Sequence, residues 1–496
     1  TGLSHSFAGT AGDVLTATAT HDLGGGSYGD TSEFSAAFTA TLNSSIAGAV
    51  FEDIAGDLLN DGAIGGANNP GSVGVEVHLL DGVGTLIDTQ VTDVNGDYAF
   101  TGLADGDFTV WVDSKTVPSA QDPTAVQGDI WAEQTYGPAD APCANGTGSS
   151  WLNAAAGSCF GGMSGAFSDG EFPSLHTHQV TLTVAGADIT SIDFGFSFNV
   201  VTNALGGDAE DDDPGANRTV QGSLRQFIQN ANAISGPNVM HFVPVEPSDA
   251  TDGTNDWWSI TATNPLPVIV DADTTVDGTA LDLADGATVL DANPAGPELE
   301  LNGAGAGGNG FELNSTNSEI RDVVINRFAT GVAITGGSAN TIAGSYIGTA
   351  ADGVTGAVGN TTQGILIDQS PNNVIGGTAG ADRNVISGNR QRGIAVDDWS
   401  DGAAVTSGGT QIINNYLGVD RTGFATVPYD GVPQYQQIGI YLLNTSGTII
   451  GTPVTTLVPP PLNQEVPGSQ MVGVPEPTAG LLLVLGAFSL LLRRRR

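Results

Sequence analysis

The chain has 496 residues, a length that allows two or three domains with a core each. Its 54 acidic against 13 basic side chains give a formal net charge of -41, which disfavours binding to nucleic acid and to anionic membranes. The 71 glycines, the scarcity of lysine and the 40% of apolar residues favour short strands and tight turns over helices or disorder. We therefore expect an all-β exported protein.

Residues 1–44 are expected to be the end of a preceding β domain. Alternating Thr and Ala flank glycine-rich turns between Asp13 and Ala40, a pattern typical of strands. The chain starts at Thr1 without a basic and then apolar leader. We expect either a fragment of a longer protein or the product of signal-peptide removal.

Alternating strands and acidic turns in residues 45–202 predict a small β-sandwich. Val75, Val77 and Leu79 would face the core, while Glu76 and His78 would face solvent.

Three motifs of this segment carry a family resemblance. They are AVFED from Ala49, TDVNGDYAF from Thr92 and GLADGDF from Gly102. The segment resembles the B-type repeats of bacterial surface adhesins, the SdrD B-like domains. This resemblance implies a non-enzymatic stalk module, often made rigid by calcium.

Four aspartates are candidate calcium ligands: Asp53, Asp57, Asp61 and Asp93. Hard divalent cations take several carboxylate oxygens, and extracellular modules bind calcium at millimolar concentrations. The resembled family has a tight Asp-x-Asn-x-Asp-Gly run, whereas this chain has a longer spacing from Asp53 to Gly62. A solvated acidic turn is the alternative, because Asp is an ordinary turn former.

An insert in the sandwich is expected at residues 121–170, and it contains both cysteines of the chain, Cys143 and Cys159. In an exported protein a disulfide between them would contribute about 3 kcal/mol in the loop-entropy model. Two unpaired thiols are the alternative.

Residues 203–221 contain the acidic run DAEDDDP and are expected to form a linker, with a calcium loop as the alternative. The segment GSLRQFIQNAN from Gly222 then predicts an amphipathic helix with Ser223 as its N-cap.

A parallel β-helix is expected after this helix, within residues 222–455. Short apolar segments bounded by Gly and Asn recur, as GVAI from Gly331, GILI from Gly364, GIAV from Gly393 and GIYL from Gly439. Stacked as rungs, such strands bury a continuous aliphatic column with Asn and Gly at the corners, and the helix would cover the first rung.

The motifs GSLRQFI and NNVIGGTAGADRNVISGN add a second resemblance. They are similar to the right-handed β-helix repeats of large bacterial surface proteins, including the capping helix. The resemblance covers about residues 200–455 and implies a right-handed coil.

The end of the chain indicates where the protein is delivered. Residues 456–473 are Pro-rich and are expected to form an extended spacer. The apolar run 478–492 would be about 22 Å long as a helix, short against a hydrocarbon core of about 30 Å. The arginines behind it would stay cytoplasmic and leave the rest of the chain outside.

A Pro-Glu-Pro element, an apolar helix and an arginine tail resemble, in this order at residues 474–496, the PEP-CTERM sorting signal. The matching residues are Val474, Pro475, Glu476, Pro477, Arg493, Arg494, Arg495 and Arg496. The resemblance implies recognition by an exosortase, a transient anchor in the inner membrane through the transmembrane helix, and removal of the tail. A plain tail anchor is the alternative.

Parallel β-helices also host polysaccharide hydrolases and lyases, so catalytic residues need consideration. The candidates are Asp397, Asp398 and Asp401, with Asp368 one rung earlier, since paired carboxylates can act as acid and base. The negative charge, the few basic side chains and the absence of a Gly-His-Gly element argue against catalysis.

Two further pairs have two interpretations each. His176 and His178 would offer two zinc ligands on one strand face, or form a solvated pair. Trp257 and Trp258 would stack on sugar rings, or plug the entrance of the coil.

We therefore expect an exported structural or adhesive protein of the bacterial cell surface or extracellular matrix. Its expected partners are the exosortase, the inner membrane before processing and an extracellular polysaccharide, with no nucleic acid. A β-helical polysaccharide hydrolase or lyase is the alternative, and ice binding through a threonine face is a weaker one.

Overall fold

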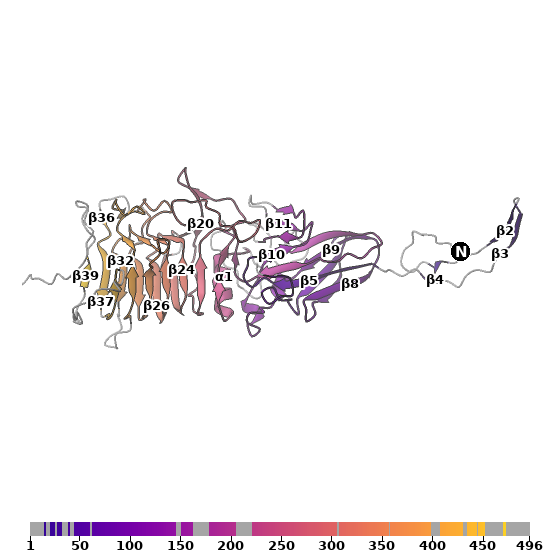
Figure 1. The fold of residues 1–496 in the computed structure, drawn as a ribbon, viewed down its shortest axis with the longest axis horizontal. Helices are drawn as coiled ribbons and strands as arrows, with labels where there is room; N and C mark the ends of the chain where they lie inside the picture. The colour runs from indigo at the N-terminus through magenta and orange to yellow at the C-terminus, as the bar shows by residue number, and fades with distance from the viewer. Residues whose placement is uncertain are drawn as a thin grey trace, which may run out of the picture.

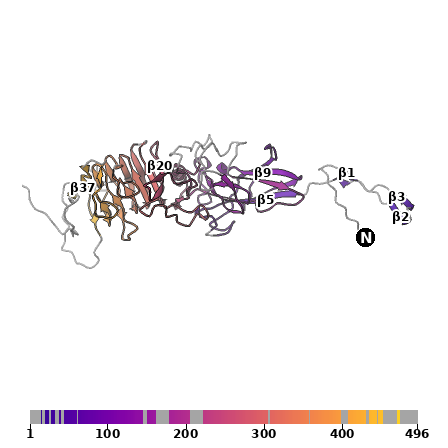
Figure 2. The same cartoon turned by 90° about the horizontal axis from the view of Figure 1, so that it is seen from above.

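The computed structural model describes residues 14–15, 20–24, 27–31, 38–39, 44–59, 62–144, 150–161, 178–204, 221–304, 307–356, 358–397, 407–429, 434–443, 445–451 and 470–472. A β-sandwich, the helix α1 (Leu224–Ala233) and a parallel β-helix follow one another along the long axis (Figures 1 and 2). The expected all-β class is confirmed.

Four short strands precede the sandwich and lie apart from it (Figure 1). They are β1 (Val14–Leu15), β2 (Thr20–Gly24), β3 (Ser27–Thr31) and β4 (Phe38–Thr39). Strand β1 pairs with β4, and β2 pairs with β3, both antiparallel.

Two sheets form the sandwich, with the strand orders β13-β10-β15-β5-β8 and β14-β9-β6-β7. Neighbouring strands are antiparallel except β5 and β15, which are parallel. The strands of both sheets are β5 (Ser44–Glu52), β6 (Glu76–Asp81), β7 (Leu86–Val91), β8 (Asp97–Leu103), β9 (Gly106–Val112), β10 (Glu133–Gly137), β13 (Gly157–Ser158), β14 (Gln179–Val184) and β15 (Phe194–Ser197).

The core of the sandwich lies between the two sheets. Val75, Val77 and Leu79 are fully buried, whereas Glu76 is exposed, which confirms the predicted alternation. They pack with inward residues of the first sheet such as Phe194.

Part of the expected insert completes this sandwich. Strands β10 and β13 belong to the first sheet, and two short 3-10 helices, Ser114–Thr116 and Gln127–Asp129, lead into β10. A hairpin of β11 (Pro142–Ala144) and β12 (Ser150–Leu152) follows.

Helix α1 begins as the sequence predicts. The Ser223 hydroxyl accepts a hydrogen bond from the Gln226 backbone N–H at 3.1 Å, which caps the first turn. Its apolar face, with Leu224, Phe227 and Ile228, is buried in the core of the β-helix. Directly after the helix, Ile234 is buried in the core of the sandwich, so this segment contacts both bodies.

Three sheets form the β-helix, and each of its middle coils contributes one strand to each sheet. The first contains β17 (Asn238–Val239), β21 (Thr274–Asp277), β24 (Glu319–Arg321), β27 (Thr341–Ala343), β30 (Val374–Gly376), β33 (Gln411–Ile413) and β38 (Ile449–Ile450). The second contains β19 (Ala250–Thr251), β20 (Asp256–Thr261), β22 (Leu299–Asn302), β25 (Val323–Asn326), β28 (Tyr346–Ile347), β31 (Val385–Ile386) and β34 (Tyr416–Leu417). The third contains β23 (Asn309–Thr316), β26 (Thr330–Ser338), β29 (Gln363–Asp368), β32 (Arg392–Asp397), β37 (Ile438–Leu443) and β39 (Gln470–Val472).

The pairings in these sheets are parallel, except at the first strand of the second sheet and the last of the third. Strand β19 pairs antiparallel with β20, and β39 pairs antiparallel with β37. A side hairpin joins β35 (Pro428–Tyr429) to β36 (Gln434–Tyr435).

Stacked aliphatic side chains fill the interior of the coil, as the repeats predict. Ile334, Ile367 and Val396 are in register on successive rungs and are fully buried. Burial of this column supplies the apolar area that each short strand cannot bury alone.

Buried asparagines occupy the corners of the coil. The Asn340 side chain accepts a hydrogen bond from the Ser318 N–H at 2.9 Å and donates to the Ser315 carbonyl at 2.8 Å. On the next rung Asn373 accepts from the Asn340 N–H at 3.0 Å. Each corner amide thus satisfies backbone groups that the turn leaves without a strand partner.

The sandwich and the β-helix are joined by direct contacts. Strand β16 (Val200–Val201) pairs in parallel with β18 (His241–Phe242). The buried Asn230 side chain of α1 accepts from the Trp131 N–H at 2.9 Å and donates to the Trp131 carbonyl at 3.0 Å. Of the expected linker 203–221, residues 205–220 lie outside the described residues.

A third apolar cluster lies between the two bodies. Leu58 and Phe160 of the sandwich pack with Val243 and Val245 after β18. The Ser158 hydroxyl also donates to the Leu283 carbonyl at 2.5 Å. The described residues on both sides of the linker therefore form one packed interface.

Candidate functional sites

The structure places only one of the three expected catalytic aspartates, because Asp398 and Asp401 lie outside the described residues. Asp397 ends β32 and is paired in register with Asp368 of β29, so the two stack on adjacent rungs. Asp397 is buried and Asp368 is half-buried. The stacking agrees with the predicted rung order.

Glu298, which the sequence did not single out, is a carboxyl with a strongly raised pKa. It precedes β22 and is buried, and burial raises its pKa to about 7, with Asp291 and Asp322 adding to the shift. A carboxyl that holds its proton near neutral pH has the property required of a general acid. Sequence pattern could not find it, because the shift arises from residues brought together by coiling.

An ionic cluster surrounds Arg321 on the first sheet of the β-helix. Its guanidinium lies 2.9 Å from Asp322, 3.2 Å from Glu319 and 3.5 Å from Asp277. Burial raises the pKa of Asp322 and of Glu319, and the Arg321 charge opposes both shifts. Asp277 and Arg321 are paired in register on neighbouring strands of the first sheet. The sequence alone does not predict this pairing, because it depends on the number of residues in each coil.

Trp258 fits the plug interpretation because it belongs to the interior core of the β-helix, whereas Trp257 packs in a separate cluster with Val324 and Tyr346. Trp257 and Trp258 are 8% and 7% exposed, which leaves no face for a sugar ring. Trp258 packs edge-on against Phe242, and its indole N–H donates to the Glu246 carbonyl at 2.8 Å. The Trp257 indole donates to Glu300 at 3.1 Å.

The expected calcium ligands do not form one described cluster. Asp61 lies outside the described residues, and Asp53, Asp57 and Asp93 are not close enough together to share an ion. Asp53 is fully buried, and its carboxylate accepts the Gly56 and Leu58 N–H groups at 2.9 Å each. Asp57 lies near Asp53, since its charge adds to the raised pKa of that carboxyl, and calcium binding in this loop stays a prediction.

Burial also raises the pKa of the Asp53 carboxyl to about 7. The adjacent Glu52, which accepts the Ala120 N–H, has its pKa raised to about 7 for the same reason, with Asp53 adding to the shift. Two neighbouring buried carboxyls thus hold protons more strongly than exposed ones.

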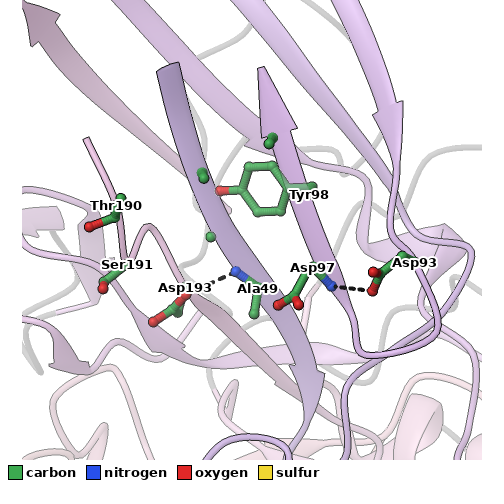
Figure 3. Close-up of a pocket in the computed structure, with 10 residues that line it drawn as sticks. Ala49, Asp93, Asp97, Tyr98, Thr190, Ser191 and Asp193 are labelled. Carbon is green, nitrogen blue, oxygen red and sulfur yellow. Dashed lines mark hydrogen bonds between the residues drawn. The ribbon is translucent and has the colours of Figure 1, made fainter. Parts of the chain in front are cut away.

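Asp93 lies instead beside an open hollow of about 500 Å³ on the sandwich (Figure 3). Asp97 and Asp193 line the same hollow. Asp193 accepts the Ala49 N–H at 2.9 Å, and Asp93 accepts the Asp97 N–H at 3.1 Å. Burial and the Asp97 charge raise the pKa of Asp193. The hollow presents hydrogen-bond acceptors and negative charge.

His178 has a structural environment. It is 1% exposed, its Nε2 lies 3.4 Å from Glu133 Oε1, and its backbone N–H donates to Gln134. It has a left-handed backbone and directly precedes β14. His176 lies outside the described residues.

Cys143 and Cys159 are joined by a disulfide, as expected for an oxidising compartment. The bond links β11 to the residue after β13 and so fixes the hairpin to the edge of the first sheet.

The expected sorting residues, Val474 to Pro477 and Arg493 to Arg496, lie outside the described residues, as does the apolar run 478–492. Within the part of the chain that the structure describes, no helix is long and apolar enough to cross a bilayer.

Two family models match the chain. The SdrD B-like domain matches residues 44–132, and the right-handed β-helix region matches residues 278–452. No curated protein matches it. The matched segments cover strands β5 to β9 of the sandwich and most of the coil, and this domain content is that of a surface or extracellular protein.

Proposed function

We propose that this chain is a structural or adhesive protein of a bacterial cell surface or extracellular matrix, sorted through a PEP-CTERM tail at residues 474–496. The observation that carries the proposal is the packed succession of sandwich, α1 and β-helix (Figure 1). Direct pairing of β16 with β18 and the buried Asn230 contacts make a stiff spacer out of two domains.

The strongly acidic surface supports a role outside the cell. A net charge of -41 keeps copies of the chain apart and disfavours anionic partners. A polysaccharide partner is therefore proposed to be neutral or amine-bearing.

Cell fractionation of an exosortase-bearing host tests the sorting step. The full chain should reach the envelope or medium with its tail removed. A Pro475→Ala, Glu476→Ala double variant should stay uncleaved in the inner membrane, while Pro459→Ala in the spacer should behave as the parent. Soluble, uncleaved parent protein in the cytosol would contradict the proposal.

Binding to immobilised neutral, amine-bearing and uronic-acid polysaccharides tests the adhesive step. We expect the protein to be retained on the neutral or the amine-bearing polysaccharide and not on the uronic-acid polysaccharide. Salt should release it from the amine-bearing polysaccharide only. Retention on the uronic-acid polymer, or on none of the three, would contradict the adhesive part and leave a purely structural role.

A polysaccharide hydrolase is the second candidate, and the raised pKa of Glu298 favours it. Glu298 would be the general acid, with Asp322 as the neighbouring carboxylate. Release of reducing ends by the parent and its loss in Glu298→Gln, but not in Asp368→Asn, would support this candidate. If the parent releases no reducing ends from any of the three polysaccharides, hydrolase activity on these polysaccharides is excluded.

A further inference from the structure

Three metal-ligating side chains meet on the outer face of the second sheet of the sandwich. Glu76 and His78 lie on β6, two residues apart and hence on the same face, and Asp113 follows β9. The Asp113 N–H donates to the Glu76 carbonyl at 3.0 Å, which sets these residues side by side. One oxygen of each acid and one His78 ring nitrogen all lie within 4.8 Å of one another.

The His78 ring is fixed by both neighbouring strands. Its Nδ1 lies 2.9 Å from Thr89 Oγ1 on β7, and the ring stacks on Trp111 of β9 with centroids 5.0 Å apart. When Nδ1–H donates to Thr89, Nε2 keeps its lone pair and faces Glu76. Metal-binding histidines are held in this way, by a hydrogen bond from the ring nitrogen that does not bind the ion.

The distances fit a shared ion better than a direct pair. His78 Nε2 and Glu76 Oε2 are 3.8 Å apart, too far for a hydrogen bond. Two ligand atoms that each lie about 2 Å from one zinc ion are roughly 3.3–4 Å apart. Two carboxylates beside one imidazole also repel each other in a chain of net charge -41, and a cation removes that repulsion.

We propose that Glu76, His78 and Asp113 form a site for a divalent transition-metal ion of the zinc class. The imidazole selects zinc, nickel or copper over calcium and magnesium, which prefer oxygen ligands alone. Three protein ligands leave one coordination position for water or for a donor from another molecule. The site shares no residue with the calcium prediction or with the proposed sorting tail.

Lys115 is the nearest basic neighbour along the chain. Its backbone N–H donates to Asp113 Oδ1 at 3.0 Å, and its ammonium lies over the Trp131 ring, 3.9 Å from the centroid. Its positive charge opposes a bound cation, so Lys115→Gln should strengthen metal binding a few-fold.

Calorimetric titration of the chelator-treated full chain with zinc chloride tests the site, and cobalt absorption reports its ligands. His78→Gln should lose one equivalent of zinc and the cobalt band. Thr89→Val should weaken binding about 10- to 100-fold with the ligands intact. Asp107→Asn, on the far end of β9, should titrate as the parent.

Circular dichroism shows which variants are folded. Thr89→Val and Lys115→Gln test the site while all three proposed ligands stay in place. Unchanged stoichiometry and affinity in folded His78→Gln would overturn the proposal. So would equal competition by calcium, since a site with an imidazole ligand should prefer zinc.

Discussion

The β-helix and the sandwich satisfy their buried polar groups in different ways. The corners of the coil use neutral amides, with Asn340 and Asn373 on successive rungs and Asn360 and Asn389 on another corner. The sandwich buries ionisable groups, Glu52 and Asp53, against backbone N–H donors. An amide does not titrate, whereas a buried carboxyl does, so the corners of the coil should be insensitive to pH, unlike Glu52 and Asp53 of the sandwich and Glu298 of the coil.

Removal of one corner amide of the β-helix should give the largest loss of unfolding free energy. Asn340→Ala leaves the Ser318 N–H and the Ser315 carbonyl buried without this partner, at a cost of about 4 kcal/mol in unfolding free energy. Denaturant unfolding measures the loss. The exposed Asn264→Ala is the control within the same coil, and an equal loss in both variants would refute the role of the corner.

Loss of the disulfide should weaken the sandwich and spare the coil. Cys143→Ser with Cys159→Ser should cost about 3 kcal/mol, because the unfolded loop is no longer closed. Hydrogen exchange resolved by segment should rise in β10 and β13 and stay unchanged in β29 and β32. An equal rise of hydrogen exchange in all four strands would show that the sandwich and the β-helix are not destabilised separately.

The pH dependence of the stability of the sandwich should be the next effect in size. The folded pKa values of Glu52 and Asp53 are raised to about 7, so their contribution is complete below about pH 4 and is lost as pH rises toward 7. We expect the sandwich to lose a few kcal/mol between pH 5 and 8 as both carboxyls ionise. Exchange in β5 measures this loss, and Asp53→Asn should flatten the profile. An unchanged slope in this variant would assign the pH effect to other groups.

Calcium should have the smallest effect, because Asp53, Asp57 and Asp93 do not form a group of three ligands among the described residues. Millimolar calcium should shift the midpoint of thermal unfolding by less than about 1 °C relative to a chelator. A rise of several degrees that is lost in Asp57→Asn would show instead that the loop from Asp53 to Gly62 forms a calcium cage.

Local pattern was sufficient for much of the fold. The Gly-bounded apolar repeats predict the rungs of the coil, Ser223 predicts the start of α1, and the alternation at Val75 to Leu79 predicts a strand with one buried face. These features depend on residues close in sequence, where strand and helix periods apply directly.

The site chemistry could not be predicted in the same way. Asp93 and Asp193 line one hollow although a hundred residues separate them, and Asp53 is turned away from it by its own loop. Asn230 and Trp131 meet across the two bodies with no shared motif. Glu298 gains its high pKa from burial, which depends on the packing of a whole coil.

The direction of the strands has a mechanical consequence. In Figure 1, β5, β8 and β9 run along the long axis, whereas β24 and β26 lie across it. Hydrogen bonds between strands are roughly perpendicular to the strands, so a pull along the axis shears the sandwich but peels the coil apart one rung at a time. Stretched between its two ends, the molecule should lengthen stepwise from the β38 end at modest force, and the sandwich should rupture last.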